Sequence, residues 1–452
     1  MPRVALHTLG CKVNQYETGK LAEDFRSRGF DLVDFSGQAD VYVINTCTVT
    51  RTADSKSRQA ARSAVRRNPR AAVVLTGCYA ETSPDQLRSI NGVTMVLGNQ
   101  EKPHLVEYVV SRLCGDMASG LREDSFRCPP ADAESAASIS AIRNQQSVRG
   151  SKSAPSPPEI RSRTRALLKI QDGCDQFCAY CVVPFARPTM SSRPHAEVLA
   201  EAEELAGRGF KEIVLTGIRL GRYQDGYVNL TSLLEAIAGV QGIERIRLSS
   251  IEVTDVPEGL ISLMARNRKL CRHLHVPLQS GDDEILSRMD RPYTASEFES
   301  FVREVRSRVP GIAVTTDIMV GFPSETAEQF DSTCRLAARL RFARTHVFRY
   351  SPRPRTAAAE LPDGVSAAEK EQRRTRLMDL AAASSQAFAS TLVGEVVPVL
   401  AEGKQSGAKM WSGLTDNYVR TVFGSGSGRV GDIVDVLVES ASGGTASGRL
   451  VT

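Results

Sequence analysis

The sequence predicts an α/β protein in three parts: an N-terminal parallel α/β domain, a central partial (β/α)6 barrel and a C-terminal small β-barrel. Up to residue 388, short β-type runs alternate with helical patterns, and one stretch without apolar periodicity interrupts this alternation. After Thr391 short strands are separated by glycine and serine, which is typical of a small β-barrel. A chain of 452 residues is long enough for about three domains.

The first α/β series occupies residues 1–113, the expected N-terminal domain. Its expected strands are Val4–Thr8, Val41–Asn45, Ala72–Thr76 and Thr94–Leu97, and its expected helices are Asn14–Arg28, Thr52–Arg67 and Lys102–Leu113. Residues 114–160 contain runs rich in Ala, Ser and Pro, and we expect them to form a low-complexity linker.

The second series occupies residues 161–388 and predicts an open barrel of six units, each strand but the last followed by a helical pattern. Its expected strands are Ala166–Ile170, Glu212–Leu215, Arg245–Leu248, Leu274–Pro277, Ala313–Val320 and His346–Arg349. Residues 389–452 form the expected small barrel, with strands at Glu395–Leu400, Asn417–Val422 and Ile433–Val438.

The composition is that of a soluble globular protein, with 41% hydrophobic and 24% charged residues. No apolar run approaches the roughly 20 residues that span a bilayer, and the first residues lack a signal-peptide pattern. We therefore expect a cytoplasmic protein without a membrane partner. In that compartment, ten cysteines favour metal or cluster ligation over disulfides. The net charge of +5 fits a polyanionic partner without requiring one.

Three cysteines follow the first strand of the second series in the pattern CxxxCxxC: Cys174, Cys178 and Cys181. Three thiolates on one loop can hold three irons of a 4Fe–4S cluster and leave the fourth iron open to a ligand. The alternative is a tetrahedral zinc site or a plain structural role, but zinc normally has a fourth Cys or His at a regular spacing, and none follows nearby. The pattern therefore favours a cluster with one open iron.

A second set of cysteines, Cys11, Cys47 and Cys78, is spread over the N-terminal domain. Each lies just past the end of an expected strand, and the carboxyl ends of parallel strands share one edge of a sheet. Gly10 and Gly77 would let the backbone approach a bulky cluster closely. The alternative is three small core residues at strand ends. Their repeated position favours a second cluster site.

The two cysteine sets and the C-terminal barrel together resemble the radical SAM methylthiotransferase family, which combines an N-terminal three-cysteine domain, a radical SAM domain and a small RNA-binding β-barrel of the TRAM type. The resemblance covers the chain except residues 115–160. Three stretches are closest to the branch that acts on N(6)-threonylcarbamoyladenosine in tRNA: His7–Thr18, Tyr42–Thr50 and Cys271–Gly281. The branches that act on isopentenyl-adenosine in tRNA and on a ribosomal-protein aspartate are the nearest alternatives.

The resemblance implies an enzyme that adds a methylthio group to carbon 2 of the modified adenosine at tRNA position 37, next to the anticodon. It implies S-adenosylmethionine (SAM) and two 4Fe–4S clusters as cofactors, one cluster binding SAM at the CxxxCxxC loop and an auxiliary one at the N-terminal cysteines. A SAM-derived radical would activate the adenine, whose C–H bond is too strong and too weakly acidic for a side-chain base. No residue beyond the cluster ligands is expected to be catalytic.

The resemblance also implies residues of a SAM pocket. Tyr180 occupies the position of the aromatic residue near the adenine, and a packing role is equally open. Thr216 and Gly217 end the second barrel strand and Gln279 follows the fourth, at the rim where such barrels bind ligands. Asp317 is a further candidate, with capping of the next helix as its alternative role.

Two positions depart from the family pattern: Pro188 replaces a usual glycine after Arg187, and Arg349 replaces a usual proline. Pro188 fixes the backbone and removes a hydrogen-bond donor near the cluster loop. Arg187 is a candidate contact to SAM or to RNA phosphate, and an exposed salt bridge is the alternative.

Basic residues point to RNA. Arg58, Arg62 and Arg66 recur every four residues on one expected helix, with Lys56, Arg67 and Arg70 beside them. A charged helix face is usually only solvated, but the C-terminal barrel adds its own basic residues, which are Lys404, Lys409, Arg420 and Arg429. We expect the tRNA anticodon stem-loop as a partner, recognised by phosphate and shape, and an electron donor such as flavodoxin or ferredoxin. A non-catalytic iron–sulfur RNA-binding regulator is the alternative from another class.

The remaining cysteines have no paired spacing and are interpreted as linker or buried thiols. They are Cys114, Cys128, Cys271 and Cys334. His273 and His275 share one face of an expected strand, and lining of the barrel interior is favoured over a metal pair because no third ligand lies in the run.

Overall fold

The computed structural model describes residues 1–118, 164–404, 410–424 and 429–451. The chain divides into two compact units, Met1–Ser162 and Arg163–Thr452. Helix α5 (Leu105–Ala118) continues past the expected domain boundary at residue 113. Residues 119–160 of the expected linker, Cys128 among them, lie outside the described residues.

The first unit contains a five-stranded parallel sheet in the order β2-β1-β3-β4-β5, which confirms the expected parallel α/β domain. Its strands are β1 (Arg3–Thr8), β2 (Asp31–Val33), β3 (Val41–Thr46), β4 (Ala72–Gly77) and β5 (Met95–Val96). Strand β2 was not expected because three residues are too short to show an alternating pattern.

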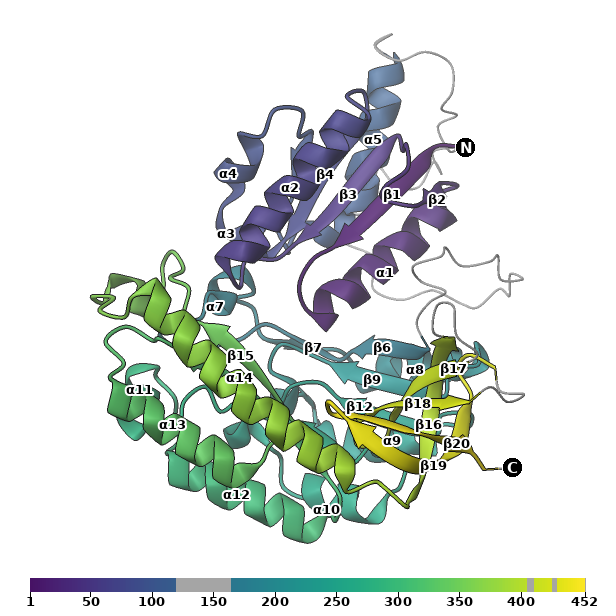
Figure 1. Cartoon of the computed structure of the whole chain (residues 1–452). Helices are drawn as coiled ribbons and strands as arrows, with labels where there is room; N and C mark the ends of the chain where they lie inside the picture. The colour runs from purple at the N-terminus through teal and green to yellow at the C-terminus, as the bar shows by residue number, and fades with distance from the viewer. Residues whose placement is uncertain (119–163, 405–409, 425–428, 452) are drawn as a thin grey trace. The chain divides into compact units, whose positions relative to one another are not determined.

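Helices cover both faces of this sheet (Figure 1). Helix α1 (Lys12–Ser27) and helix α5 pack on one face, and helix α2 (Arg51–Arg67) packs its alanines on the other. All residues of β3 and β4 are buried, as in parallel strands with two covered faces. Two short helices, α3 (Cys78–Thr82) and α4 (Pro84–Arg88), follow β4.

The second unit begins with six parallel strands that pair in chain order, as expected for a partial barrel. They are β6 (Arg165–Lys169), β9 (Glu212–Thr216), β12 (Arg245–Leu248), β13 (His273–His275), β14 (Ala313–Val320) and β15 (Arg344–Arg349). They form two three-stranded sheets, which are linked by backbone bridges from Ile246 to Leu270 and from Ser250 to His275. Among the described residues, β6 and β15 are not paired with each other, so the barrel is open.

The helices between these strands cover the outside of one large apolar core. They are α8 (His195–Gly207), α9 (Leu230–Gly239), α10 (Leu260–Arg266), α11 (Asp283–Arg288), α12 (Ala295–Arg308) and α13 (Ala327–Leu340), and α14 (Ala367–Ser390) follows β15. Capping boxes at Asn229, Thr294, Thr326 and Ser366 start four of them. No helix in the described ranges is long and apolar enough to cross a membrane.

The C-terminal strands form a closed five-stranded barrel, as expected. Its strands are β16 (Val396–Lys404), β17 (Met410–Thr415), β18 (Arg420–Gly424), β19 (Ile433–Ser442) and β20 (Thr445–Leu450). Strands β17 and β20 were not expected, since glycine, serine and threonine make up much of both.

Buried arginines connect this small barrel to the open barrel. Arg247 on β12 donates hydrogen bonds to Glu212 (2.7 Å), to the carbonyl of Asp416 (2.9 Å) and to that of Thr415 (3.1 Å), and its guanidinium lies 4.8 Å from the ring centroid of Tyr418. Arg245 donates to the carbonyls of Leu414 and Pro398. Because these charges are desolvated, their hydrogen bonds hold the small barrel in one position on β12.

Replacing Arg247 with Met should destabilise the small barrel by about 3–5 kcal/mol, because Glu212 then remains buried without its main cation. The single tryptophan, Trp411, lies in the core of the small barrel, so its fluorescence during denaturant unfolding reports on this unit. The control is Arg303→Met, which removes a largely exposed ion pair with Glu299 and should cost at most about 1 kcal/mol. Equal losses in the two variants would contradict the prediction.

Candidate iron–sulfur sites

The three N-terminal cysteines lie at one edge of the parallel sheet. Cys11 precedes α1, Cys47 follows β3 and Cys78 begins α3 directly after β4. In the register, Thr8 pairs with Asn45 and Thr46 pairs with Gly77, so the strands end side by side. Burial, together with smaller effects of the neighbouring Cys78 and Cys11 thiols, raises the pKa of Cys47 to about 12. The expected convergence of the three thiols is therefore present.

Two glycines allow the close approach of these loops. Gly10 has a φ of +99°, and a Cβ there would lie 2.7 Å from the Cβ and 2.8 Å from the Sγ of Cys47. Gly77 has a φ of +96°, and a Cβ there would lie 2.5 Å from the carbonyl oxygen of Thr46. Any side chain would strain the backbone and displace the neighbouring cysteine loop.

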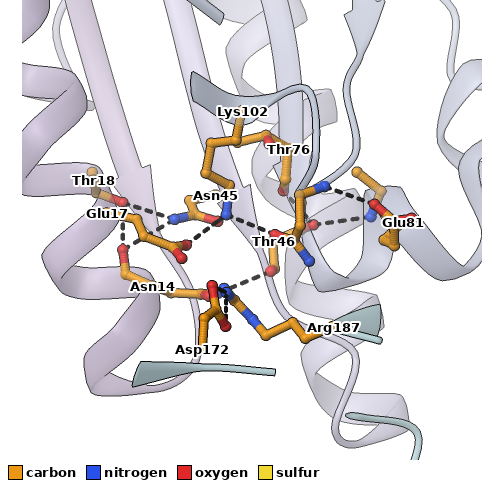
Figure 2. Close-up of polar contacts among 12 residues, drawn as sticks. Asn14, Glu17, Thr18, Asn45, Thr46, Thr76, Glu81, Lys102, Asp172 and Arg187 are labelled. Atoms are coloured by element: carbon orange, nitrogen blue, oxygen red, sulfur yellow. Dashed lines mark hydrogen bonds and ion pairs between the residues drawn. The ribbon is translucent and has the colours of Figure 1, made fainter. Parts of the chain in front are cut away.

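Side-chain hydrogen bonds tie the cysteine loops together (Figure 2). Asn14 donates to the carbonyl of Leu9 (2.8 Å) and to that of Thr46 (3.0 Å), which joins the loop before Cys11 to the end of β3. The Thr46 hydroxyl donates to the carbonyl of Thr76 (2.6 Å) and accepts from the amide of Ala80 (3.2 Å), which joins β3 to the segment containing Cys78.

A buried cation lies behind this edge. The ammonium of Lys102 donates to Glu17 (2.6 Å), Asn99 (2.8 Å) and Asn45 (3.3 Å), and Figure 2 shows Lys102, Glu17 and Asn45 turned toward one another. Glu17 and Lys102 are almost completely buried, so their charges compensate each other in a site of low dielectric. Asn45 also donates to the carbonyl of Asn14 (3.0 Å), which connects this ion pair to the cysteine loops.

The donor set fits an iron–sulfur cluster better than a single metal ion. Among the described residues, no three His, Cys, Asp or Glu side chains are arranged to hold one metal ion. A cubane cluster separates its cysteine ligands further than one ion does, so thiols that share an edge without touching are compatible with it.

The second cysteine set lies on the loop between β7 (Gln171–Asp172) and α7 (Val183–Ala186). The loop starts at Gly173, which has a φ of +80°. A Cβ at this position would lie 2.0 Å from the carbonyl oxygen of Thr189, so only glycine fits there. The amide of Cys174 donates to the carbonyl of Arg187 (3.1 Å), and the loop closes without a donor at Pro188. The departure from the family pattern at Pro188 therefore leaves the loop intact.

Two arginines place positive charge beside these thiols. Arg291 donates to the Sγ of Cys178 (3.4 Å) and forms an ion pair with Glu252. Arg219 binds Asp255 through two hydrogen bonds and also contacts Asp175 on the cluster loop. Burial raises the pKa of Cys178 and of Cys174, while Arg291 and Arg219 respectively oppose that rise and favour the thiolates that iron requires.

Burial has its largest effect on the third thiol, and raises the pKa of Cys181 to about 12. The neighbouring thiols of Cys178 and Cys174 contribute to this rise. Metal binding must displace protons from such buried thiols.

The SAM-pocket candidates after β9 lie beside the cluster loop. Thr216 is buried at the end of β9, and Gly217 lies where a Cβ would be 3.0 Å from the Oε1 of Gln171. That oxygen accepts from the amides of Ile218 (3.0 Å) and Arg219 (2.7 Å), while the Gln171 amide donates to the carbonyl of Gly173 (2.9 Å). Gln171 thus joins the two loops.

Two further candidates for the SAM pocket, Gln279 after β13 and Asp317 on β14, are in contact. The backbone amide of Gln279, a non-glycine residue with a φ of 65°, donates to the carbonyl of Asp317 (2.9 Å). Asp317 lies inside β14 and contacts the Nε2 of His275 at 3.2 Å. The alternative role of Asp317 as a helix cap is wrong, because Thr326 caps α13.

Tyr180 packs beside an apolar cluster that includes Met289, Phe322 and Tyr350. Burial raises its phenol pKa well above the ordinary value, and Arg291 opposes the rise. The packing role of this loop residue is therefore present in the structure.

Arg187 is buried, so the alternative of an exposed salt bridge is wrong. Its guanidinium donates to both carboxylate oxygens of Asp172, each at 2.8 Å (Figure 2). The side chain, at the C-terminal end of α7, is only 2% exposed.

Cys271 and Cys334 are buried free thiols, as expected. His273 and His275 both hydrogen-bond to the hydroxyl of Thr315, at 3.0 and 2.9 Å, and the His273 ring contacts the tilted ring of Tyr418 with centroids 4.6 Å apart. These contacts support a barrel-lining role over a metal pair.

Sequence reasoning missed the residues that organise the sites. They are Asn14, Asn45, Thr46, Lys102, Gln171, Arg219, Glu252 and Arg291. Asn45 and Thr46 immediately precede Cys47, and polar side chains next to a candidate cluster cysteine could have been predicted from the sequence to support that site. The partners of Lys102 and Arg291 are distant in sequence, and no local pattern predicts them.

Three family models match the chain. Residues 3–98 match "Uncharacterized protein family UPF0004", residues 168–337 match the radical SAM superfamily and residues 390–451 match the TRAM domain.

Curated relatives align over nearly the whole chain. The threonylcarbamoyladenosine tRNA methylthiotransferase MtaB of Bacillus subtilis is 39% identical over 98% of this chain and 94% of its own length. The protein of the same name from Thermotoga maritima is 37% identical over 98% and 95%. The tRNA-2-methylthio-N(6)-dimethylallyladenosine synthase of Methylobacillus flagellatus is 31% identical over 99% of both chains.

Among solved structures, the radical S-adenosylmethionine methyltransferase TsrM of Kitasatospora setae aligns with a TM-score of 0.55. It is 20% identical and covers 79% of this chain and 77% of its own, so the likeness concerns the fold alone.

Replacing Gly10 with Ala should reduce the iron bound at the N-terminal site, because the new methyl would displace Cys47. Gly29→Ala is the matched control: Gly29 also has a positive φ, +81°, but no atom lies within 4 Å of its Cβ position. Each change should cost about 1–2 kcal/mol of backbone strain.

The measurement is iron content after anaerobic reconstitution, with Cys174, Cys178 and Cys181 replaced by Ala so that only the N-terminal site can bind. The control should retain about four irons per chain and the Gly10 variant well under half of that. Equal iron content in both variants would contradict the steric argument.

Proposed function

The chain belongs to the radical SAM methylthiotransferase family, and from this premise we propose that it adds a methylthio group to carbon 2 of N(6)-threonylcarbamoyladenosine at position 37 of tRNA. The observation that carries the proposal is the pair of three-cysteine sites at strand ends, one in each unit, in a chain that aligns end to end with curated relatives of that activity. The relatives named for the dimethylallyl-adenosine reaction align at lower identity.

Family membership implies SAM and 4Fe–4S clusters as cofactors. We assign Cys174, Cys178 and Cys181 to the cluster that binds SAM, and the N-terminal cysteines to the auxiliary cluster. When bound, these groups supply a radical that activates an aromatic C–H bond and a sulfur for insertion, which no side chain provides.

The chain's own residues position these groups. Arg291 and Arg219 hold positive charge beside the thiolates of the CxxxCxxC loop, and Gln171 keeps that loop in contact with the Gly217 loop. Thr216, Gly217, Gln279, Asp317 and Tyr180 form the proposed SAM pocket at the carboxyl ends of the barrel strands.

The TRAM barrel supports RNA as the substrate, and the proposed recognition element is the anticodon stem-loop. The reaction consumes electrons, and we propose that a cytoplasmic electron-donor protein such as flavodoxin or ferredoxin supplies them. A non-catalytic iron–sulfur RNA-binding regulator would bind a cluster and RNA without cleaving SAM, and the alignment with curated methylthiotransferases over nearly the whole chain favours the enzyme instead.

Deleting the gene should remove the 2-methylthio derivative of N(6)-threonylcarbamoyladenosine from total tRNA, and the precursor should accumulate. Mass spectrometry of tRNA nucleosides, with the complemented strain as control, measures both. Loss of the isopentenyl derivative instead would move the protein to the neighbouring branch, and no change in either nucleoside would refute a tRNA substrate.

Replacing Cys178 with Ala should abolish 5′-deoxyadenosine formation from SAM, because two thiolates cannot hold the cluster with its SAM-binding iron. Cys334→Ala is the control, since Cys334 is equally buried but lies on α13 outside both sites. Product is quantified by liquid chromatography after reduction of the reconstituted enzyme. Persistent 5′-deoxyadenosine in the Cys178 variant would refute the assignment.

A further inference from the structure

Helix α2 carries a row of positive charges without carboxylate partners. Its only acidic residue, Asp54, is buried and accepts a hydrogen bond from Thr48 (2.7 Å). Within the described residues, none of the following five cations forms an ion pair: Lys56, Arg58, Arg62, Arg66 and Arg67. By contrast, α12 pairs Arg303 with Glu299 and Arg308 with Glu304.

This arrangement costs stability. Arg58, Arg62 and Arg66 are spaced by four residues, and like charges at that spacing destabilise a helix by about 0.2–0.5 kcal/mol per pair. Nothing inside the first unit compensates the charge of Arg62 or Arg66 in the described residues. A negatively charged partner would compensate these charges.

Two members of the row, Arg58 and Arg62, line a groove between α2 and α4. The groove has a volume of about 440 Å³ and is lined by Arg58, Arg62, Gln86, Ser89, Ile90 and Asn91. It therefore combines two cations with neutral hydrogen-bonding side chains, the set that phosphate oxygens accept from.

One cation in the groove is held in place. Arg58 donates to the hydroxyl of Tyr79 (2.6 Å), which in turn donates to Gln86 (2.7 Å). Tyr79 is buried and follows Cys78, so the position of Arg58 is coupled to the segment that carries a proposed cluster ligand. A preorganised guanidinium loses little entropy on binding an anion.

We propose that the α2–α4 groove binds the sugar-phosphate backbone of the substrate RNA. The inference rests on the proposed function. It gives the first unit, Met1–Ser162, an RNA-docking surface of its own, in addition to the proposed RNA-binding surface of the TRAM barrel. Such a surface holds the RNA strand close to the auxiliary site independently of base identity, because phosphates carry no sequence information.

Two charge changes on different elements test the groove in the full-length protein: Arg62→Glu on α2 and Ser89→Glu at the end of α4. The control is Arg335→Glu on α13, an exposed residue without an ion pair among the described residues, which changes the net charge as Arg62→Glu does. Thermal unfolding establishes that each variant is folded.

The measurement is fluorescence anisotropy with a labelled anticodon stem-loop at several salt concentrations. Each groove variant should raise Kd about tenfold near 100 mM salt. Arg62→Glu should also lower the slope of log Kd against log salt by about 1. The loss should be equal for stem-loops with altered loop bases, and Arg335→Glu should bind as the wild type does.

The outcomes separate this proposal from the proposed function. A wild-type protein that binds no tRNA refutes the proposed function itself. If the wild type binds tRNA and the groove variants bind it equally well, the docking surface is refuted and the function stands. Unchanged tRNA affinity with slower reduction by an acidic electron-donor protein would assign the groove to that protein and overturn the proposal.

Discussion

Parallel pairing of β1, β3 and β4 is the constraint on which the N-terminal site depends. The pairing of Thr8 with Asn45 and of Thr46 with Gly77 makes three strands end at one edge. Cys47 and Cys78 follow their strands directly, and Cys11 follows the end of β1 after two intervening residues. A one-residue shift in this register would move Cys47 away from Gly10 and reverse which side chains face the core. The same rule places the CxxxCxxC loop and the Gly217 loop at the carboxyl ends of β6 and β9.

Both sites then use an amide side chain to hold their loops together. Asn14 bonds the carbonyls of Leu9 and Thr46, and Gln171 bonds the amides of Ile218 and Arg219 and the carbonyl of Gly173. A side-chain amide has both hydrogen-bond donors and an acceptor but no charge. It can therefore hydrogen-bond to the buried backbone N–H and C=O groups of the loops without needing a counter-ion. These contacts link the loops that carry the cysteines to neighbouring loops and strand ends.

Charge is distributed differently at the two sites. Beside the CxxxCxxC loop, Arg291 and Arg219 lie next to the thiols and are themselves paired with Glu252 and Asp255. In the N-terminal unit the buried cation Lys102 is neutralised by Glu17, while Arg62 and Arg66 on α2 are exposed and have no ion pair among the described residues. Internal charges therefore stabilise loops and ligands, while the surface charges remain available to a polyanion.

The sequence by itself determined the three-part architecture, nearly all of the long strands, and the two cysteine sets with their placement after strand ends, because hydrophobic periodicity and local spacing are properties of neighbouring residues. It did not predict the strands β2, β17 and β20, the burial of Arg187, or the contacts of Asn14, Lys102 and Arg291. Those features join segments as distant as Glu17 and Lys102 or Cys178 and Arg291. Only the tertiary structure decided them, because a buried charge selects its partner by where the fold places it and not by its sequence neighbours.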